Sequence, residues 1–202
     1  MSEAIGYDFK ICLADSMEST HLNWLDEEYK KSFSFNGKMI RIERVEDLER
    51  QKNGIDALVY FEDGMVFTIQ EKKVTKKYYH ILLELESYDK FTGKSNRPGW
   101  LYTRQSDFLA YSQNVPKLDY KMLYIFPFAL LKSAWQRNEN TWRKLADDRK
   151  DGFRYTDADN YKYNRYSYTT RCIAIPPDKL VNAIRLLAYY TPICGKVAGG
   201  DD

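Results

Sequence analysis

The stretch GIDALVYFEDGMVFTIQEKK, residues 54–73, limits the possible folds of this chain more than any other. Two runs of β-branched and aromatic residues flank Asp63 and Gly64, a pattern typical of a β-hairpin. The first run follows Asp56 directly, and the second ends on the letters QEKK. These charges are either solvated strand ends or parts of an assembled site, and periodicity alone leaves both interpretations open.

Loop length decides which of these side chains share a face of the hairpin, because successive residues of a strand point to opposite faces. With a two-residue loop, Asp56 lies opposite Glu71, and Lys73 shares their face. With a three-residue loop, every residue of the second strand shifts by one position relative to the first.

We expect the three-residue loop, 62–64 with Gly64 left-handed, because Asp-Gly lacks the strong preference of Asn-Gly for the tight turn. Asp56 then lies opposite Gln70, with Lys72 beside them. In both registers an acid meets a polar residue and a lysine at the end of a strand. Oxygen ligands hold a hard divalent cation, and a lysine orients water or stabilises charge, so such a group suits phosphodiester hydrolysis.

Composition argues against several other classes of function. Lys and Arg number 31 against 29 Asp and Glu, a net charge of +2, so a nucleic-acid partner has to be bound by local patches. Three scattered cysteines without a CxxC motif argue against a disulfide framework or a zinc site. Only His21 and His80 are available to a catalytic triad, and no nucleophile motif accompanies them.

The remaining patterns predict one cytoplasmic domain of the α/β class, with a mixed central sheet flanked by helices and no membrane partner. We expect its core over about residues 38–142. The expected elements are helices over 14–31, 128–147 and 178–190, a strand pair around Asn36-Gly37, and strands over 78–86, before Pro127 and over 169–175. We expect strand 78–86 to extend the hairpin into an antiparallel sheet, residues 151–168 to be mainly loop, and the tail 195–202 to be mobile.

Several segments together resemble the PD-(D/E)XK nuclease superfamily, whose pattern is an Asp, then an acid, any residue and Lys on the next strand. GID at 54–56 and IQEKK at 69–73 carry this resemblance. More narrowly, the chain is similar to a group of phage and bacterial proteins of the superfamily over about residues 47–142. The segments are QKNGIDALVYFEDGMVFTIQEKK, ILLELES, GWLYTRQSDFLAY and YIFPFALLKSAWQRNENTW.

The resemblance implies a restriction-endonuclease-like core that hydrolyses DNA, or as a second choice RNA, with Mg²⁺ or Mn²⁺. If Lys72 is the motif lysine, the acid position holds Gln70; if it is Lys73, Glu71 supplies the acid. We favour Asp56, Gln70 and Lys72 as catalytic residues and keep Glu71 with them. The expected metal ligands are Asp56, Gln70, Glu71 and Glu84, since an acid on the following strand would restore the missing carboxylate.

Substrate contacts are expected from cations near the hairpin: Lys76, Lys77, Arg97 and Arg104. Trp100 either packs in the core or stacks on a base, and Gln51 either positions a phosphate or water or is an ordinary loop residue. Two alternatives to the nuclease stay open. One is a nucleic-acid-binding protein whose chemistry is weakened by Gln70, and the other is a phage-type protein that binds a host protein.

Overall fold

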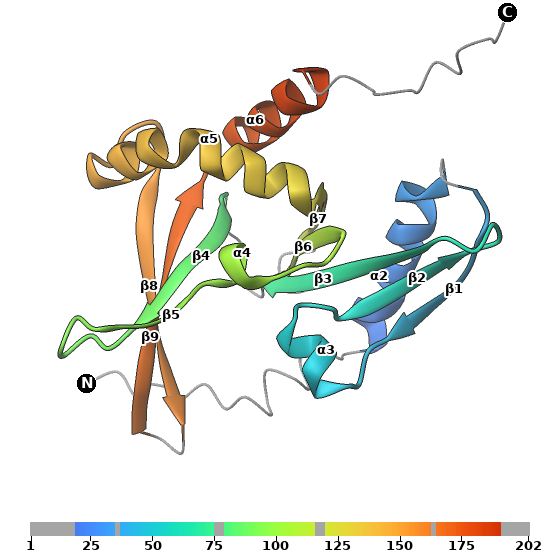
Figure 1. Cartoon of the computed structure of the whole chain (residues 1–202), viewed down its shortest axis with the longest axis horizontal. Helices are drawn as coiled ribbons and strands as arrows, with labels where there is room; N and C mark the ends of the chain where they lie inside the picture. The colour runs from blue at the N-terminus through green and yellow to red at the C-terminus, as the bar shows by residue number, and fades with distance from the viewer. Residues whose placement is uncertain (1–18, 35–36, 75–78, 116–119, 163–164, 191–202) are drawn as a thin grey trace, which may run out of the picture.

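The computed structural model describes residues 19–34, 37–74, 79–115, 120–162 and 165–190, which form an α/β protein with two β-sheets (Figure 1). The five-stranded sheet has the order β1 (Met39–Arg44), β2 (Ala57–Phe61), β3 (Val66–Val74), β6 (Phe108–Val115) and β7 (Tyr120–Pro127). The four-stranded sheet has the order β5 (Ser95–Pro98), β4 (Ile81–Tyr88), β9 (Arg165–Ile175) and β8 (Arg154–Lys162). The helices are α2 (Ser19–Ser32), α3 (Leu48–Lys52), α4 (Trp100–Thr103), α5 (Phe128–Asp147) and α6 (Pro177–Tyr190).

The five-stranded sheet is mixed, as expected. Strands β1, β2 and β3 are antiparallel neighbours, β3 pairs in parallel with β6, and β6 pairs antiparallel with β7. The parallel pair forces a long connection between β3 and β6, because a parallel neighbour is reached only by crossing over. That connection carries β4, β5 and α4, so two strands of the second sheet are inserted within the first.

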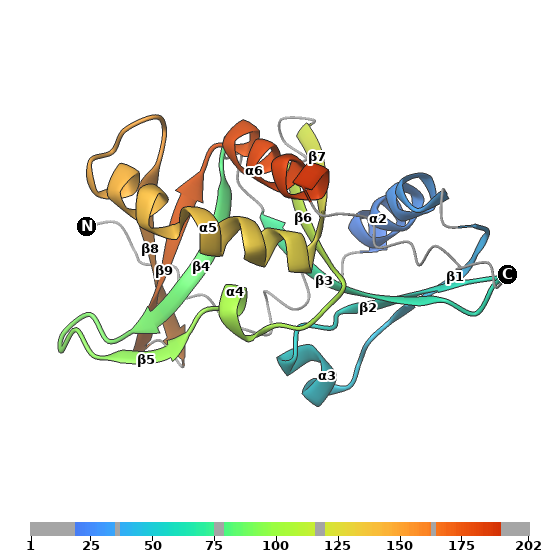
Figure 2. The same cartoon turned by 45° about the horizontal axis from the view of Figure 1, so that its top comes forward.

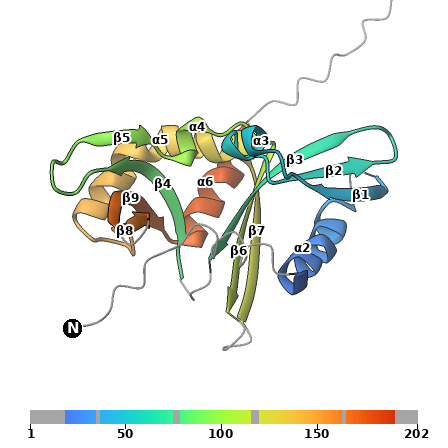
Figure 3. The ribbon, with the colours of Figure 1, turned by 90° about the horizontal axis from the view of Figure 1, so that it is seen from below.

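Helix α2 covers one face of the five-stranded sheet, and the short helix α3 lies on the other side of β1 and β2 (Figures 2 and 3). Leu25, Tyr29 and Phe33 recur every four residues, so they form one apolar stripe along the helix and its C-terminal turn. The stripe is buried against Val59 and Ile69 of the hairpin. This packing fixes which face of β3 remains for a site.

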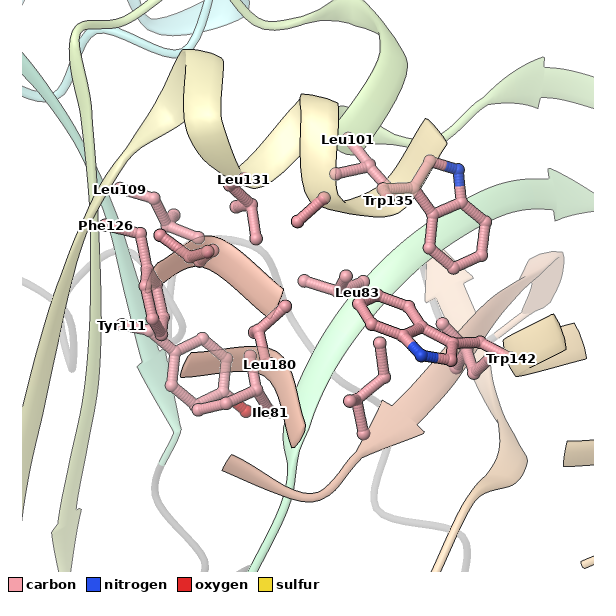
Figure 4. Close-up of a cluster of buried hydrophobic side chains, with 14 of the residues drawn as sticks. Ile81, Leu83, Leu101, Leu109, Tyr111, Phe126, Leu131, Trp135, Trp142 and Leu180 are labelled. Carbon is pink, nitrogen blue, oxygen red and sulfur yellow. The ribbon is translucent and has the colours of Figure 1, made fainter. Parts of the chain in front are cut away.

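A larger core joins the two sheets beneath α5 and α6. Leu109 and Tyr111 from the five-stranded sheet belong to one cluster with Leu83 from the four-stranded sheet and with Leu131 and Trp135 from α5 (Figure 4). The hydroxyl of Tyr111 also accepts a hydrogen bond of 3.3 Å from the backbone N–H of Leu82. The two sheets therefore share one hydrophobic core, and the cluster beneath α2 is a second, separate one.

Three expectations about strands were wrong. Strand β4 does not extend the hairpin but pairs with β9 and β5 in the second sheet. Strand β1 pairs with β2, and the segment before it ends helix α2, so no strand precedes Gly37 within the described residues. Residues 154–162 and 165–168 are strand rather than loop, and they pair as β8 and β9.

The expected helices over 128–147 and 178–190 are confirmed by α5 and α6, to within one residue. The first part of the expected N-terminal helix and the tail 195–202 lie outside the described residues. Within the described part of the chain, no helix is both long and apolar enough to span a membrane.

Candidate functional site

The β2–β3 hairpin has the register of the three-residue loop, so this prediction is confirmed. Ala57 pairs with Ile69 and Tyr60 with Val66, which leaves residues 62–64 as the loop. Gly64 has φ +88°, the left-handed conformation that an L side chain rarely adopts. Continuing the register places Asp56 across from Gln70.

The strand period divides the polar end of β3 between two faces. Glu71 faces α2, where its carboxylate accepts hydrogen bonds from the Tyr29 hydroxyl, at 2.9 Å, and from the Arg44 guanidinium. The other nitrogen of that guanidinium pairs with Asp26. Its partners therefore separate Glu71 from the expected ligand set, and we leave it out of that set.

Asp56 is held at the start of β2 by the neighbouring strand. Its Oδ2 accepts a hydrogen bond of 2.8 Å from the backbone N–H of Glu71, and its backbone carbonyl accepts one of 3.0 Å from Val45. Burial raises the pKa of Asp56, while the hydrogen bond from Glu71 and the charges of Lys72 and Arg104 act in the opposite direction. A carboxylate oxygen accepts more than one bond, so this contact leaves the carboxylate with capacity for a ligand.

Gln70 lies on the same face as Asp56 and is 2% exposed. Its side-chain oxygen, Oε1, is buried without a hydrogen-bond partner in the described part of the chain. An unpaired buried acceptor costs about 1–3 kcal/mol, so native proteins rarely keep one without a reason. A bound cation or a donating ligand would satisfy it.

Lys72 is the next residue of β3 on the same face as Gln70. Burial lowers the pKa of its ammonium, and the carboxylates of Glu84 and Asp56, in that order, oppose this effect. Its Nζ lies 5.7 Å from the centre of the Trp100 ring, and Trp100 is 5% exposed. Trp100 therefore packs in the core beside the lysine.

Glu84 comes to this region from the second sheet. It sits on β4 opposite Cys172 of β9, and its charge reaches both Lys72 and the Cys172 thiol. Burial is the main cause that raises the pKa of Cys172 to about 12, so this cysteine stays a neutral thiol at physiological pH. The contribution of Glu84 means that the candidate site is assembled from both sheets.

Arg104 follows helix α4 and lies directly against the turn that precedes Asp56. A Cβ added to Gly54 would lie 2.6–2.9 Å from Cδ, Cγ and Cβ of Arg104, so the arginine stem crosses a position without a side chain. The Arg104 carbonyl accepts a hydrogen bond from Lys132 of α5. Its Nε is buried and has no hydrogen-bond partner among the described residues.

Of the other expected substrate contacts, only Arg97 lies within the described residues. Arg97 is on β5, where it donates a hydrogen bond of 3.1 Å to the Tyr168 hydroxyl and lies 5.0 Å above that ring. Lys76 and Lys77 fall outside the described residues. Gln51 donates a hydrogen bond of 2.7 Å to the Val45 carbonyl, so it stabilises the loop before the site.

The candidate ligands, two carboxylates and one amide, suit a hard divalent cation. Asp56, Gln70 and Glu84 offer oxygen atoms, the ligands that Mg²⁺ and Mn²⁺ prefer. No group of three or more His, Cys, Asp or Glu side chains that could hold a metal occurs among the described residues. The unpaired Gln70 oxygen is the observation that fits a cation here.

Sequence reasoning missed the polar network on the opposite face of β3, which joins Arg44, Glu71, Tyr29 and Asp26. His21 was named from the sequence, but not its burial: it is 1% exposed, and its Nε2 lies 3.4 Å from the Ser112 hydroxyl. The stripe of α2 that includes Tyr29 was visible in the sequence, but its pairing with β3 spans 42 positions and follows only from the fold.

No family model, no curated protein and no solved structure matches the chain.

Proposed function

We propose that the chain is a divalent-metal-dependent nuclease that hydrolyses phosphodiester bonds in DNA, with RNA as the second choice of substrate. The observation that carries the proposal is the hairpin register, which gives Asp56, Gln70 and Lys72 one face while Glu71 faces the other way. That is the set favoured by the resemblance to the PD-(D/E)XK superfamily. The mixed sheet has helices on both faces (Figure 3), and this supports a restriction-endonuclease-like core.

Each residue of this set has a role that its environment suits. Asp56, Gln70 and Glu84 would hold Mg²⁺ or Mn²⁺, which when bound polarises the phosphate and acidifies water. Lys72 stays beside two carboxylates, where its ammonium orients the attacking water or stabilises negative charge on the phosphate. The water oxygen bonds to phosphorus as the P–O bond to the leaving sugar oxygen breaks, and the proton that the water gives up ends on that leaving oxygen.

The matched test uses two lysines that are adjacent on β3 but face opposite ways. Lys72→Met should lower the rate of plasmid or oligonucleotide cleavage about a hundredfold or more, as expected when a charged transition-state contact is removed. Lys73→Met should change it by less than about threefold. Wild-type cleavage by the Lys72 variant, or equal losses in both, would contradict the proposed site.

A second candidate function is favoured by Gln70 itself. A neutral amide holds a cation less strongly than the carboxylate of the superfamily pattern, so the chain would bind nucleic acid with weakened chemistry. Gln70→Glu separates the two functions, because it adds the missing charge at a buried position. We expect Mn²⁺ to bind more tightly to Gln70→Glu than to the wild type, as measured by calorimetry.

Wild-type cleavage supports the nuclease, and cleavage that appears only in Gln70→Glu supports the weakened binder. Binding to oligonucleotides should weaken steeply as salt rises, because Lys and Arg release condensed counterions from the nucleic acid. A flat response to salt would instead favour the host-protein alternative.

A further inference from the structure

We infer that Arg104 is the residue that binds the scissile phosphate, and that Gly54 and Lys132 position it for this purpose. The inference rests on the proposed function and deepens it. It assigns Arg104 to the reacting group itself, not to general attraction of the nucleic-acid backbone. It therefore predicts an effect on turnover more than on affinity.

The position of Arg104 is set by its stem. Gly54 has φ +81°, and any side chain there would overlap three carbon atoms of Arg104. The Arg104 stem thus packs against the turn before Asp56, in space that a side chain at residue 54 would occupy. Because Gly54 and Asp56 are two residues apart, the same turn positions both the arginine and the proposed ligand carboxylate.

The backbone of Arg104 is fixed from two sides. Its N–H donates a hydrogen bond of 3.1 Å to the Trp100 carbonyl, and its own carbonyl accepts one from Lys132 of α5. With both backbone groups held, the freedom of the side chain is limited to its own rotamers. This is the arrangement expected of a group that has to be in place before its ligand arrives.

The guanidinium has unused hydrogen-bonding capacity close to charged groups. Nε is buried and unpartnered among the described residues, and an unpaired buried donor is costly. Arg104 lies against Gly54, two residues before Asp56, and its charge lowers the pKa of Asp56 and that of Lys72. A phosphate oxygen would satisfy Nε, and the planar fork of an arginine suits two such oxygens at once.

The arginine neither gains nor loses a proton in this role. It neutralises charge that builds on the non-bridging oxygens while the water oxygen adds and the leaving oxygen departs. Its contribution should therefore be larger in the transition state than in the bound substrate, which is the condition for an effect on kcat.

The experiment compares four variants in oligonucleotide cleavage with Mg²⁺ or Mn²⁺, with Lys72→Met as a further reference for rescue by guanidinium. Arg104→Met keeps the stem that packs on Gly54 and removes the guanidinium, Arg104→Lys keeps the charge, and Arg104→Ala opens a space. Arg41→Ala is the control, because Arg41 is an exposed arginine of β1 paired with Glu43 at 3.3 Å. Thermal unfolding of each variant reports whether it folds.

We expect Arg104→Met to lower kcat about a hundredfold with KM changed by only a few fold, and Arg104→Lys to lose less. Added guanidinium ion should restore part of the turnover of Arg104→Ala but none of that of Lys72→Met. Arg41→Ala should cleave as the wild type does.

If the wild type cleaves and Arg104→Met retains its kcat, or loses only affinity, the assignment of Arg104 is wrong while the nuclease stands. If folded Arg104→Ala is inactive and guanidinium does not restore it, the arginine acts through structure and the assignment also fails. If the wild type itself does not cleave any nucleic acid with either metal, the proposed function fails, and this inference fails with it.

Discussion

Asp56 is a buried carboxyl in the candidate site, and its ionisation affects the stability of the fold. Burial is the largest influence on it and raises its pKa above the ordinary value of 3.8. The folded state therefore holds the proton more tightly than the unfolded state does. A group of this kind makes unfolding easier as pH rises through its pKa, because the fold then contains a charge that it disfavours.

We predict that Asp56→Asn abolishes cleavage and raises the melting temperature at pH 7. Asparagine still accepts the hydrogen bond from the Glu71 N–H, but it carries no buried charge. The stability difference from the wild type should vanish below about pH 3, where aspartate is protonated in both states, and grow as pH rises. Thermal unfolding of both proteins across this pH range checks the sign, and a less stable variant at pH 7 would contradict it.

His21 has the opposite linkage on the other side of β3. Burial and the nearby charges of Lys73, Arg44 and Lys121 lower its pKa from 6.5 to about 4. The unfolded chain binds a proton in that window and the folded chain does not, so stability falls as pH drops from 6.5 to about 4.

We predict that the wild type loses about 3 kcal/mol more than His21→Gln over this pH interval, from the size of the pKa shift. Urea unfolding of both proteins at pH 7 and pH 4 measures the difference. Equal pH dependence in the two proteins would show that His21 is protonated in the folded state.

At the scale of elements, the site depends on how closely α4 approaches β4. Gly99 precedes α4, and a Cβ there would lie 2.1 Å from the backbone oxygen of Glu84. The Gly99 N–H also donates a hydrogen bond of 2.8 Å to the Leu85 carbonyl. Glycine at this position thus lets α4, with Trp100 and the adjoining Arg104, approach the strand that carries Glu84.

We predict that Gly99→Ala destabilises the protein by about 1–3 kcal/mol, or more, because backbone atoms have to move apart. Cleavage should fall as well, since Glu84 and Arg104 separate. Gly99 has φ −69°, which alanine adopts without strain, so the loss reports the clash with the Glu84 backbone and not a backbone conformation. A loss below about 0.5 kcal/mol, the size of an ordinary surface substitution, would show that the contact with Glu84 is unimportant.

The sequence predicted those elements whose evidence is local. The turn at Asp63-Gly64 determined the hairpin register, and the seven-residue spacing of Trp135 and Trp142 indicated α5. Strand β8 was not predicted because it is largely exposed and therefore lacks an alternation of apolar residues. It is held instead by cross-strand contacts such as the ion pair of Asp157 with Arg171, at 3.1 Å.

The residues of the candidate site also differ in whether local sequence patterns predict them. Asp56, Gln70 and Lys72 follow from one local turn, and their common face was predicted. Glu84 was named from the sequence, but it acts on Lys72 from the second sheet, where its strand pairs with β9. No local sequence pattern reveals that pairing. Glu71 was kept as an alternative ligand from the sequence, and the hydrogen-bond partners that hold it on the other face come from α2 and β1, which no local pattern reveals.

For the whole molecule, the shared core predicts that the two sheets unfold together. Leu131 is fully buried in the cluster that contains side chains from both sheets and from α5 (Figure 4). The face of each sheet that lines this cluster would be exposed to water if the other sheet unfolded.

We predict a single unfolding transition, coincident by circular dichroism and tryptophan fluorescence, and a loss of about 2–5 kcal/mol in Leu131→Ala. Leu186→Ala should change stability by less than about 0.5 kcal/mol, because Leu186 is 59% exposed. Two separated transitions would mean that the sheets are independent domains.

The insertion of β4 between β3 and β6 has a consequence for a chain that is still being made. Ribosomal synthesis proceeds from the N-terminus, so Ile81 emerges long before Ile175, the residue with which it pairs. Until then Glu84 has no neighbouring strand on that side, and Lys72 lacks its strongest counter-charge. Nascent chains released early by premature termination should therefore carry the hairpin without a working centre, and they should expose the unpaired edge of β4 to chaperones and to aggregation.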